Sequence, residues 1–93
     1  MFKIVKIEGD SLYPFLKNGQ KAFCIRLFYF NNLKINDFVI FKHKTQGLMI
    51  KQITKIKNDK YYLKGTSSFS IDSRDFGYLD KEELLYKVLF KII

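Results

Sequence analysis

Apolar and polar residues alternate with a period of two along most of this chain. Such alternation is typical of half-buried β-strands, because successive side chains on a strand point to opposite faces of the sheet. Turn residues interrupt it, and Asn58-Asp59 and residues 45–47 are predicted to be tight turns between strands. The pattern predicts a hairpin-rich, mostly antiparallel protein with strands near residues 2–8, 21–27, 37–43, 48–57, 60–65 and 85–92.

Helical signals are scarce. Residues 11–16 fit one short turn, in which Pro14 is acceptable in the first positions, and residues 80–85 resemble a capped single turn before the last strand. In residues 27–32, three aromatic residues after Leu27 run into a polar turn. This cluster fits either core at a strand end or an apolar loop tip, and core is favoured because clusters of three aromatic residues usually find a partner. The predicted fold class is therefore all-β.

The composition supports one compact domain, residues 1–93. Hydrophobic residues make up 47% of the chain, which is ample for a core without disulfides or metal. The single cysteine, Cys24, has no internal partner, and Cys24 with His43 cannot supply a structural zinc site. We expect a cytoplasmic protein, since no apolar run approaches about 18 residues and early lysines interrupt any signal-peptide pattern.

The net charge is +8, from fifteen lysines and two arginines against nine acidic residues. This charge makes a polyanion or an anionic membrane surface a plausible neighbour. The lysines are dispersed among apolar residues, however, which is more typical of solvated strand faces than of a nucleic-acid groove. Nucleic-acid binding is therefore not favoured as the primary function, whereas peripheral membrane contact stays open.

Three segments carry residues suited to hydrolytic chemistry. Ser11 follows Gly9-Asp10 in a segment that must turn sharply out of the first strand, a geometry that can leave backbone N–H groups facing an oxyanion. Lys51 shares a strand face with the apolar residues Met49 and Ile53, which would partly dehydrate its amine and favour the neutral form. Taken singly, an ordinary loop serine and a solvated lysine are the better interpretations.

The third segment, residues 70–74, places two hydroxyls, a carboxylate and an arginine within five positions. Asp72 and Arg74 can pair across a turn, and a bidentate arginine would brace such a loop. A solvated surface turn is an equally good interpretation of this segment by itself.

The order and spacing of the three segments resemble those of type I signal peptidases and the related self-cleaving SOS repressors. Ser11 with Pro14 resembles their serine box, and Lys51, 40 positions after Ser11, resembles their general-base box. Residues 35–41 resemble the intervening Gly-Asp-Val-Val-Phe strand. Residues 70–77 match every fixed position of the terminal box Ser-x-Asp-Ser-Arg-x-x-Gly, so the resemblance spans nearly the whole chain.

The resemblance implies a role for each matching residue. Ser11 would be the nucleophile and its backbone N–H an oxyanion donor, Lys51 the general base, and Ser70 the hydroxyl that orients the lysine amine. Asp72 and Arg74 would form the structural brace beside the site. The implied fold is a compact, antiparallel, partly open barrel-like coiled sheet with minimal helix, and no cofactor or metal is implied.

The chain departs from the family pattern at several positions. Leu12 stands where a methionine is usual, Gln20 replaces an acidic residue, Asn36 a glycine, and Gln52 an arginine. Gly9 takes the place of a hydroxyl residue that assists the oxyanion in signal peptidases, as in the repressor branch. Oxyanion stabilisation would then rest on backbone groups, and one lost donor typically costs about 10²- to 10³-fold in rate. We expect a slow or narrowly dedicated enzyme.

Two functions follow as hypotheses. The first is a soluble processing endopeptidase that cuts a protein or pro-peptide after a small residue through an acyl-enzyme, acting on one dedicated partner or on itself. The membrane anchors and large extra domain of housekeeping signal peptidases are not present, which argues against general signal-peptide removal. The second is a non-catalytic β module that binds a protein partner or an anionic surface. His43 is expected on a neighbouring strand rather than at the base position, and Cys24 as apolar filler.

Overall fold

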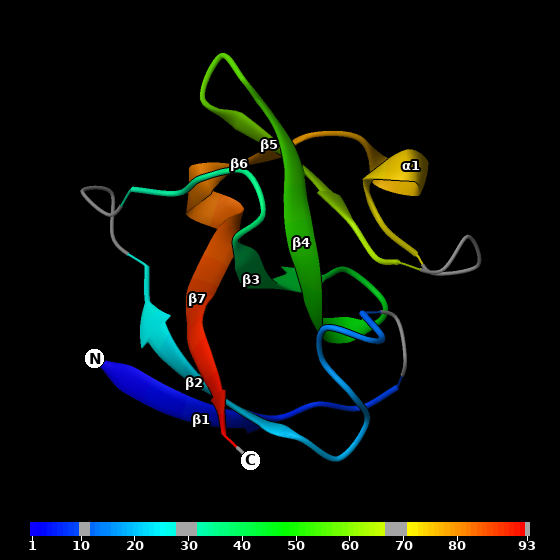
Figure 1. The fold of residues 1–93 in the computed structure, drawn as a ribbon. Coiled ribbons are helices and arrows are strands. Elements are labelled where there is room, and N and C mark those ends of the chain that lie inside the picture. Colours follow the sequence, from blue (N-terminus) through cyan, green and yellow to red (C-terminus); the bar gives the residue numbers. More distant parts are fainter. Residues whose placement is uncertain (10–11, 28–31, 67–70, 93) are drawn as a thin grey trace.

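The computed structural model describes residues 1–9, 12–27, 32–66 and 71–92 (Figure 1). Its elements, in chain order, are β1 (Phe2–Lys6), β2 (Lys21–Arg26), β3 (Phe38–His43), β4 (Gly47–Lys57), β5 (Lys60–Lys64), α1 (Ser73–Phe76), β6 (Leu79–Asp80), a 3-10 helix (Lys81–Glu83) and β7 (Leu84–Ile92). All six predicted strands are present within a few residues of their predicted bounds. Sequence alternation did not predict the two-residue β6 or the single-turn α1.

The strands form one antiparallel sheet in the order β1-β2-β7-β3-β4-β5-β6. β1 and β6 are its two edges, so the sheet is open rather than closed on itself. Figure 1 shows it strongly curled, with β1 and β2 at one end and the β4–β5 hairpin at the other. This confirms the predicted all-β, antiparallel, partly open architecture with minimal helix.

The turns explain how the register is set. Asn58 and Asp59, predicted to form a tight turn, have φ values of 51° and 62°, the left-handed pair that a two-residue hairpin needs. The chain turns again over residues 44–46, between β3 and β4. Asp80 is the N-cap residue of the 3-10 helix before β7, where a capped turn was predicted, and its backbone N–H donates to Glu83 Oε2 at 2.8 Å, as in a capping box. The described residues 12–16 form turns without a helix.

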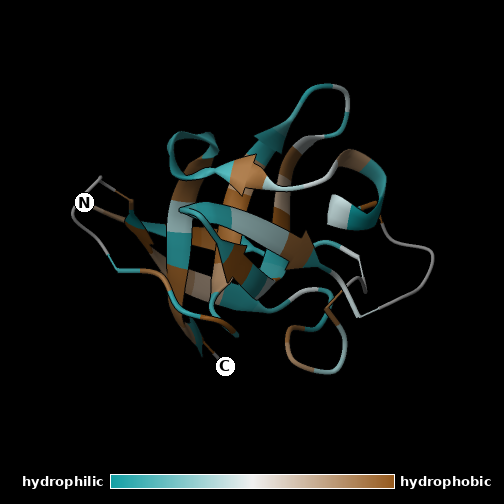
Figure 2. Ribbon diagram, turned by 90° about the horizontal axis from the view of Figure 1, so that it is seen from above, coloured by the Kyte–Doolittle hydropathy of each residue, from teal (hydrophilic) through white to brown (hydrophobic). Residues whose placement is uncertain are grey.

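Two apolar clusters fill the two sides of the central strand β3. Val39 and Phe41 belong to one cluster with Leu27, Ile53, Tyr61, Leu63 and Leu84. Ile40, between them on the strand, belongs to the other cluster with Ile7, Leu12, Leu16, Ala22 and Cys24. Because side chains alternate along a strand, β3 is buried on both faces and links the clusters. Figure 2 shows the resulting alternation of hydrophobic and hydrophilic bands along the ribbons.

Of the segment 27–30, the structure describes Leu27 and none of the three aromatic residues that follow it. Leu27 is buried in the first cluster, and residues 28–30 lie outside the described ranges. Within those ranges, no helix combines the length and apolar character required to cross a membrane.

Candidate active site

Lys51 is a buried lysine in the middle of β4. Its residue exposure is 2%, and its cross-strand partner Val39 and its same-face neighbour Ile53 are fully buried. Met49, the neighbour on the other side, is half-buried against the first cluster. Lysines are almost never this buried without a partner, because an ammonium loses its hydration on burial.

The burial of Lys51 favours the neutral amine. Within the described part of the chain, Lys51 has no hydrogen bond or ion pair at its side chain. Burial lowers the pKa of Lys51 below its ordinary value; the carboxylate of Asp72 raises it and the Arg74 guanidinium lowers it, with a smaller raising effect from Asp75. Desolvation is the largest of these effects, so the pKa of the Lys51 amine lies below the ordinary value for lysine.

A cavity of about 350 Å³ opens beside Lys51. Its wall combines the end of β1 and the residues that follow it with β3 and the start of β4, through Val5, Lys6, Ile7, Glu8, Ile40, Gln46, Leu48, Met49, Ile50 and Lys51. A volume of this size suits a short peptide segment or a small ligand. Because Glu8 stands three residues before Ser11, the cavity links the candidate base to the part of the chain that leads to the candidate nucleophile.

Ser11 itself lies outside the described residues, together with Asp10. The chain on both sides is tied to the fold. Gly9 has a φ of +84°, a left-handed conformation that favours glycine, and its backbone N–H donates to Asn18 Oδ1 at 2.9 Å. Leu12 is 1% exposed and packs in the second cluster, and its carbonyl accepts hydrogen bonds from the next turn.

One hydrogen bond joins the two ends of the predicted site. The Thr66 hydroxyl donates to the carbonyl of Tyr13 at 2.7 Å, across 53 positions of sequence. Tyr13 follows Ser11 by two residues, and Thr66 is the last described residue before the segment that contains Ser70. Ser70 lies outside the described residues. The contact nevertheless places the chain that precedes Ser70 beside the chain that follows Ser11.

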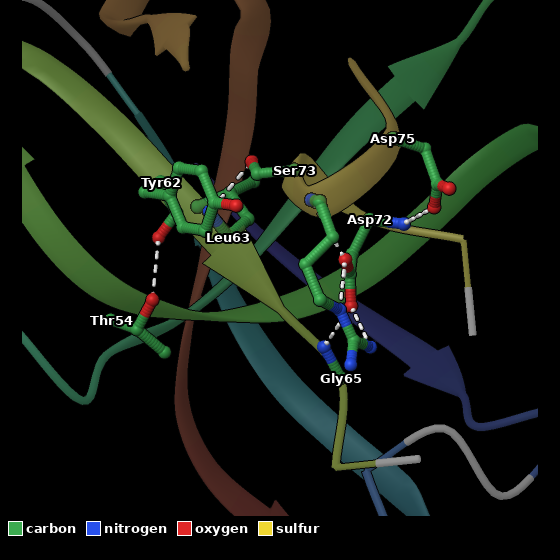
Figure 3. Close-up of polar contacts among 8 residues, drawn as sticks. Thr54, Tyr62, Leu63, Gly65, Asp72, Ser73 and Asp75 are labelled. Atoms are coloured by element: carbon green, nitrogen blue, oxygen red, sulfur yellow. Dashed lines mark hydrogen bonds and ion pairs between the residues drawn. The ribbon is translucent and has the colours of Figure 1, made fainter. Parts of the chain in front are cut away.

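Asp72 and Arg74 form a bidentate ion pair (Figure 3). Arg74 donates from Nε to Asp72 Oδ1 at 2.8 Å and from Nη2 to Oδ2 at 2.6 Å. The buried carboxylate also accepts the backbone N–H groups of Gly65 at 2.9 Å and Arg74 at 3.0 Å. Burial alone would raise the pKa of Asp72, but the hydrogen bonds from Arg74 and Gly65 lower it to about 2.

The same segment is anchored to the sheet through α1. Asp72 is the N-cap of α1, and its own backbone N–H donates to Asp75 Oδ2 at 3.1 Å, which completes a capping box. The buried Ser73 hydroxyl accepts the backbone N–H of Leu63 in β5 at 2.8 Å (Figure 3). These contacts hold the carboxylates of Asp72 and Asp75 where they act on Lys51.

The residues that depart from the signal-peptidase pattern have local structural roles. Asn36 has a φ of +82°, which glycine adopts freely and asparagine tolerates, so the substitution keeps the backbone geometry. The Gln20 side chain accepts the Lys17 N–H at 2.8 Å, as a carboxylate could. Gln52 donates to the Asn36 carbonyl at 3.4 Å, and Leu12 is buried in the second cluster.

His43 and Cys24 take no part in this arrangement. His43 lies on β3, and its Nδ1 accepts the backbone N–H groups of Thr45 and Gln46 at 3.2 Å, so the ring caps the β3–β4 turn. Cys24 is fully buried in the second cluster, where desolvation raises the pKa of its thiol while the charge of Lys3 lowers it. No group of three or more potential metal-ligating side chains occurs in residues 1–9, 12–27, 32–66 and 71–92.

Sequence reasoning missed three contributors to the site. Thr66 makes the long-range hydrogen bond to Tyr13, and Glu8 lines the cavity. Asp75 completes the capping box of α1 and raises the pKa of Lys51. For Asp75 a signal was available, because Asp72-x-x-Asp75 has the spacing of a capping box. Thr66 and Glu8 act through tertiary contacts, which local spacing does not reveal.

A scan of protein-family models found no match to this chain, and a search of curated proteins also found none.

Proposed function

We propose that this chain is a serine endopeptidase of the signal-peptidase and SOS-repressor type, in which Lys51 is the base and Ser11 the nucleophile. The observation that carries the proposal is the burial of Lys51 beside a cavity, without an ion pair in the described part of the chain. A lysine that only solubilises the surface would not lose its hydration in this way.

In the proposed reaction, the neutral Lys51 amine accepts the Ser11 hydroxyl proton as the oxygen attacks the scissile carbonyl carbon. The backbone N–H of Ser11 donates to the oxyanion. The Lys51 ammonium then protonates the leaving amine, which departs and leaves an acyl-enzyme on Ser11. Water, deprotonated by Lys51, hydrolyses this ester and restores the free serine.

The remaining site residues support this chemistry in our proposal. The Thr66–Tyr13 hydrogen bond holds the flanks of the serine and Ser70 segments together, and Ser70 orients the amine. The Asp72–Arg74 pair braces the second segment. The substrate would be an extended segment of a protein that is cut after a small residue, as the resemblance implies. The cavity beside Lys51 would receive part of that segment.

Covalent labelling tests the assignment of the nucleophile. A fluorophosphonate or penem should add one mass increment to the wild-type protein and none to Ser11→Ala, because only an activated serine reacts at a useful rate. Ser67→Ala serves as the matched serine control and should label like wild type. Intact-protein mass spectrometry gives the readout, and peptide mapping should place the adduct on Ser11. Labelling of Ser11→Ala at the wild-type rate would remove Ser11 from the mechanism.

A non-catalytic β module is the second candidate function. The aromatic side chains exposed on β1 and β7, such as Phe2 and Phe90, favour it, since they form a surface that the peptidase reaction does not use. This candidate predicts that wild type takes up no label and that Ser11→Ala leaves every binding property unchanged.

A further inference from the structure

Three phenylalanines stack across neighbouring strands at the β1 edge of the sheet. The ring centroids of Phe2 (β1) and Phe23 (β2) are 5.1 Å apart, and those of Phe23 and Phe90 (β7) are also 5.1 Å apart. The interplanar angles are 21° and 19°, so the three rings lie nearly parallel. Phe2 is 62% exposed and Phe90 56%, which is unusual for side chains of this size.

Ile4 extends this surface. It is the direct cross-strand partner of Phe23 and is itself 55% exposed. The neighbours of Phe23 on β2, Ala22 and Cys24, point to the opposite face and are fully buried. The phenylalanine patch, defined as Phe2, Ile4, Phe23 and Phe90, therefore lies on the solvent face of the sheet as one contiguous apolar surface. Contiguous apolar surfaces of this kind mark interaction sites.

The strands that carry the patch are also strongly cationic. β1, β2 and β7 have no acidic residue. Of their six basic residues, Lys6 and Lys21 alternate onto the same face as Ile4 and Phe23, and Lys87 is paired with Asp37 at 3.4 Å. The other three, Lys3, Arg26 and Lys91, belong to the opposite face. Lys6 and Lys21 are direct cross-strand partners, and neither has an ion pair within the described residues. Like charges placed opposite one another destabilise a sheet, so a negatively charged partner would relieve this pair.

We propose that the phenylalanine patch docks on the surface of an anionic lipid bilayer. Aromatic and aliphatic side chains would enter the boundary between headgroups and acyl chains, while Lys6 and Lys21 would contact anionic headgroups with their apolar stems along the interface. Each such lysine adds to the attraction of the protein for an anionic surface. The combination of apolar insertion and charge is the pair of signals that stable peripheral binding needs.

The geometry of the patch disfavours two other partners. Nucleotide bases stack on free aromatic faces, but both faces of Phe23 and one face each of Phe2 and Phe90 are covered by the neighbouring rings. A second copy of the chain would bring the Lys6–Lys21 pairs of two molecules together, with no acid on these strands to pair them. An anionic bilayer matches both the ring edges and the charge.

Docking would bring the candidate active site close to the bilayer. β1 carries Phe2 and Ile4 of the patch, and its last residues Val5 and Lys6 line the cavity beside Lys51. The proposal is independent of the peptidase assignment, because it depends on surface residues and not on Ser11.

Sedimentation with lipid vesicles tests the proposal. Wild-type protein should bind vesicles of phosphatidylcholine and phosphatidylglycerol at about three to one, and bind pure phosphatidylcholine at least about tenfold more weakly. Phe2→Ser/Phe90→Ser should weaken binding to the anionic vesicles at least about tenfold, because less apolar surface would be buried in the bilayer. Lys6→Gln/Lys21→Gln should weaken it severalfold and reduce its dependence on salt.

Matched variants control for general loss of apolar surface or charge. Ile35→Ser/Ile56→Ser removes exposed apolar residues elsewhere, and Lys44→Gln/Lys57→Gln removes exposed charge from turns or strand ends outside the patch. Both should bind like wild type, and circular dichroism should show every variant folded. Equal binding by wild type and Phe2→Ser/Phe90→Ser would overturn the proposal. The proposal would also be overturned if wild type bound an oligonucleotide, or dimerised in solution, and Phe2→Ser/Phe90→Ser abolished that binding or dimerisation.

Discussion

Replacing Lys51 with methionine is expected to slow covalent labelling of Ser11 by about 10²- to 10⁴-fold, the usual contribution of a general base. Methionine has a similar length and fills the same buried space without an amine. Lys51 is 2% exposed and shares its strand face with buried apolar residues, so the fold should accept the change. The rate of labelling by a serine-reactive probe, followed by mass spectrometry, gives the measurement.

The same substitution should change how stability depends on pH. Because the pKa of Lys51 is lower in the folded than in the unfolded protein, the unfolded chain binds more protons between those two values. The lysine therefore destabilises the fold below its folded pKa, and this penalty disappears as pH rises toward the unfolded value of about 10.4. Lys51→Met should be at least as stable as wild type near neutral pH. Its free energy of unfolding should not show the increase at high pH that is expected for wild type.

Lys57→Met, on the exposed end of the same strand, is the matched control. It should label at the wild-type rate and keep the wild-type dependence of stability on pH. Full labelling activity in Lys51→Met would exclude Lys51 as the base, whatever the variant did to stability.

Asp72→Asn is expected to produce the largest loss of stability, about 2 to 3 kcal/mol in the free energy of unfolding. From described residues, the buried carboxylate accepts four hydrogen bonds, two from the Arg74 side chain and two from backbone N–H groups. An amide places a donor where one of these donors now lies. Urea denaturation near neutral pH, followed by circular dichroism, measures the effect.

The carboxylate of Asp72 should also account for part of the acid sensitivity of the fold. Its pKa is about 2 in the folded protein, lower than in the unfolded chain, so the folded state favours the ionised form. The resulting stability, about 2 kcal/mol, is complete above about pH 5 and is lost as pH falls toward 2. The difference in stability between wild type and Asp72→Asn should therefore narrow in acid.

Asp75→Asn tests whether this effect belongs to Asp72. The side chain of Asp75 accepts one hydrogen bond, from the Asp72 N–H, and an amide oxygen can replace it. The control should lose less than about 1 kcal/mol. If Asp72→Asn were as stable as wild type at neutral pH, the ion pair would not brace this segment.

The strands were predictable because their burial follows local periodicity. On β2 and β5, apolar residues such as Ala22, Cys24, Tyr61 and Leu63 alternate with less buried neighbours, as the sequence pattern indicates. The position of β7 between β2 and β3 was not predictable, because that pairing joins segments more than forty residues apart. β6 has two residues and α1 four, too few for a period to be detected.

In the candidate site, too, the features set by local sequence were predictable, and those set by long-range contacts were not. Alternation along β4 predicts the burial of Lys51 from its neighbours Met49 and Ile53. The cavity and the hydrogen bond between Thr66 and Tyr13 depend on chain segments brought together only by folding. The influence of Asp72 on Lys51 likewise crosses 21 positions of sequence. The role of Ser11 as nucleophile remains a prediction from the sequence.

Titration of the Lys51 amine decides whether this lysine can act as a base near neutral pH. Carbon-13 labelling of the lysine ε-carbons would resolve the fifteen lysines by NMR, with Lys51→Met identifying the signal of interest. We predict that this one signal titrates well below about 10.4, the value typical of solvated lysines. A Lys51 signal that titrates together with those of the exposed lysines would contradict the proposed mechanism.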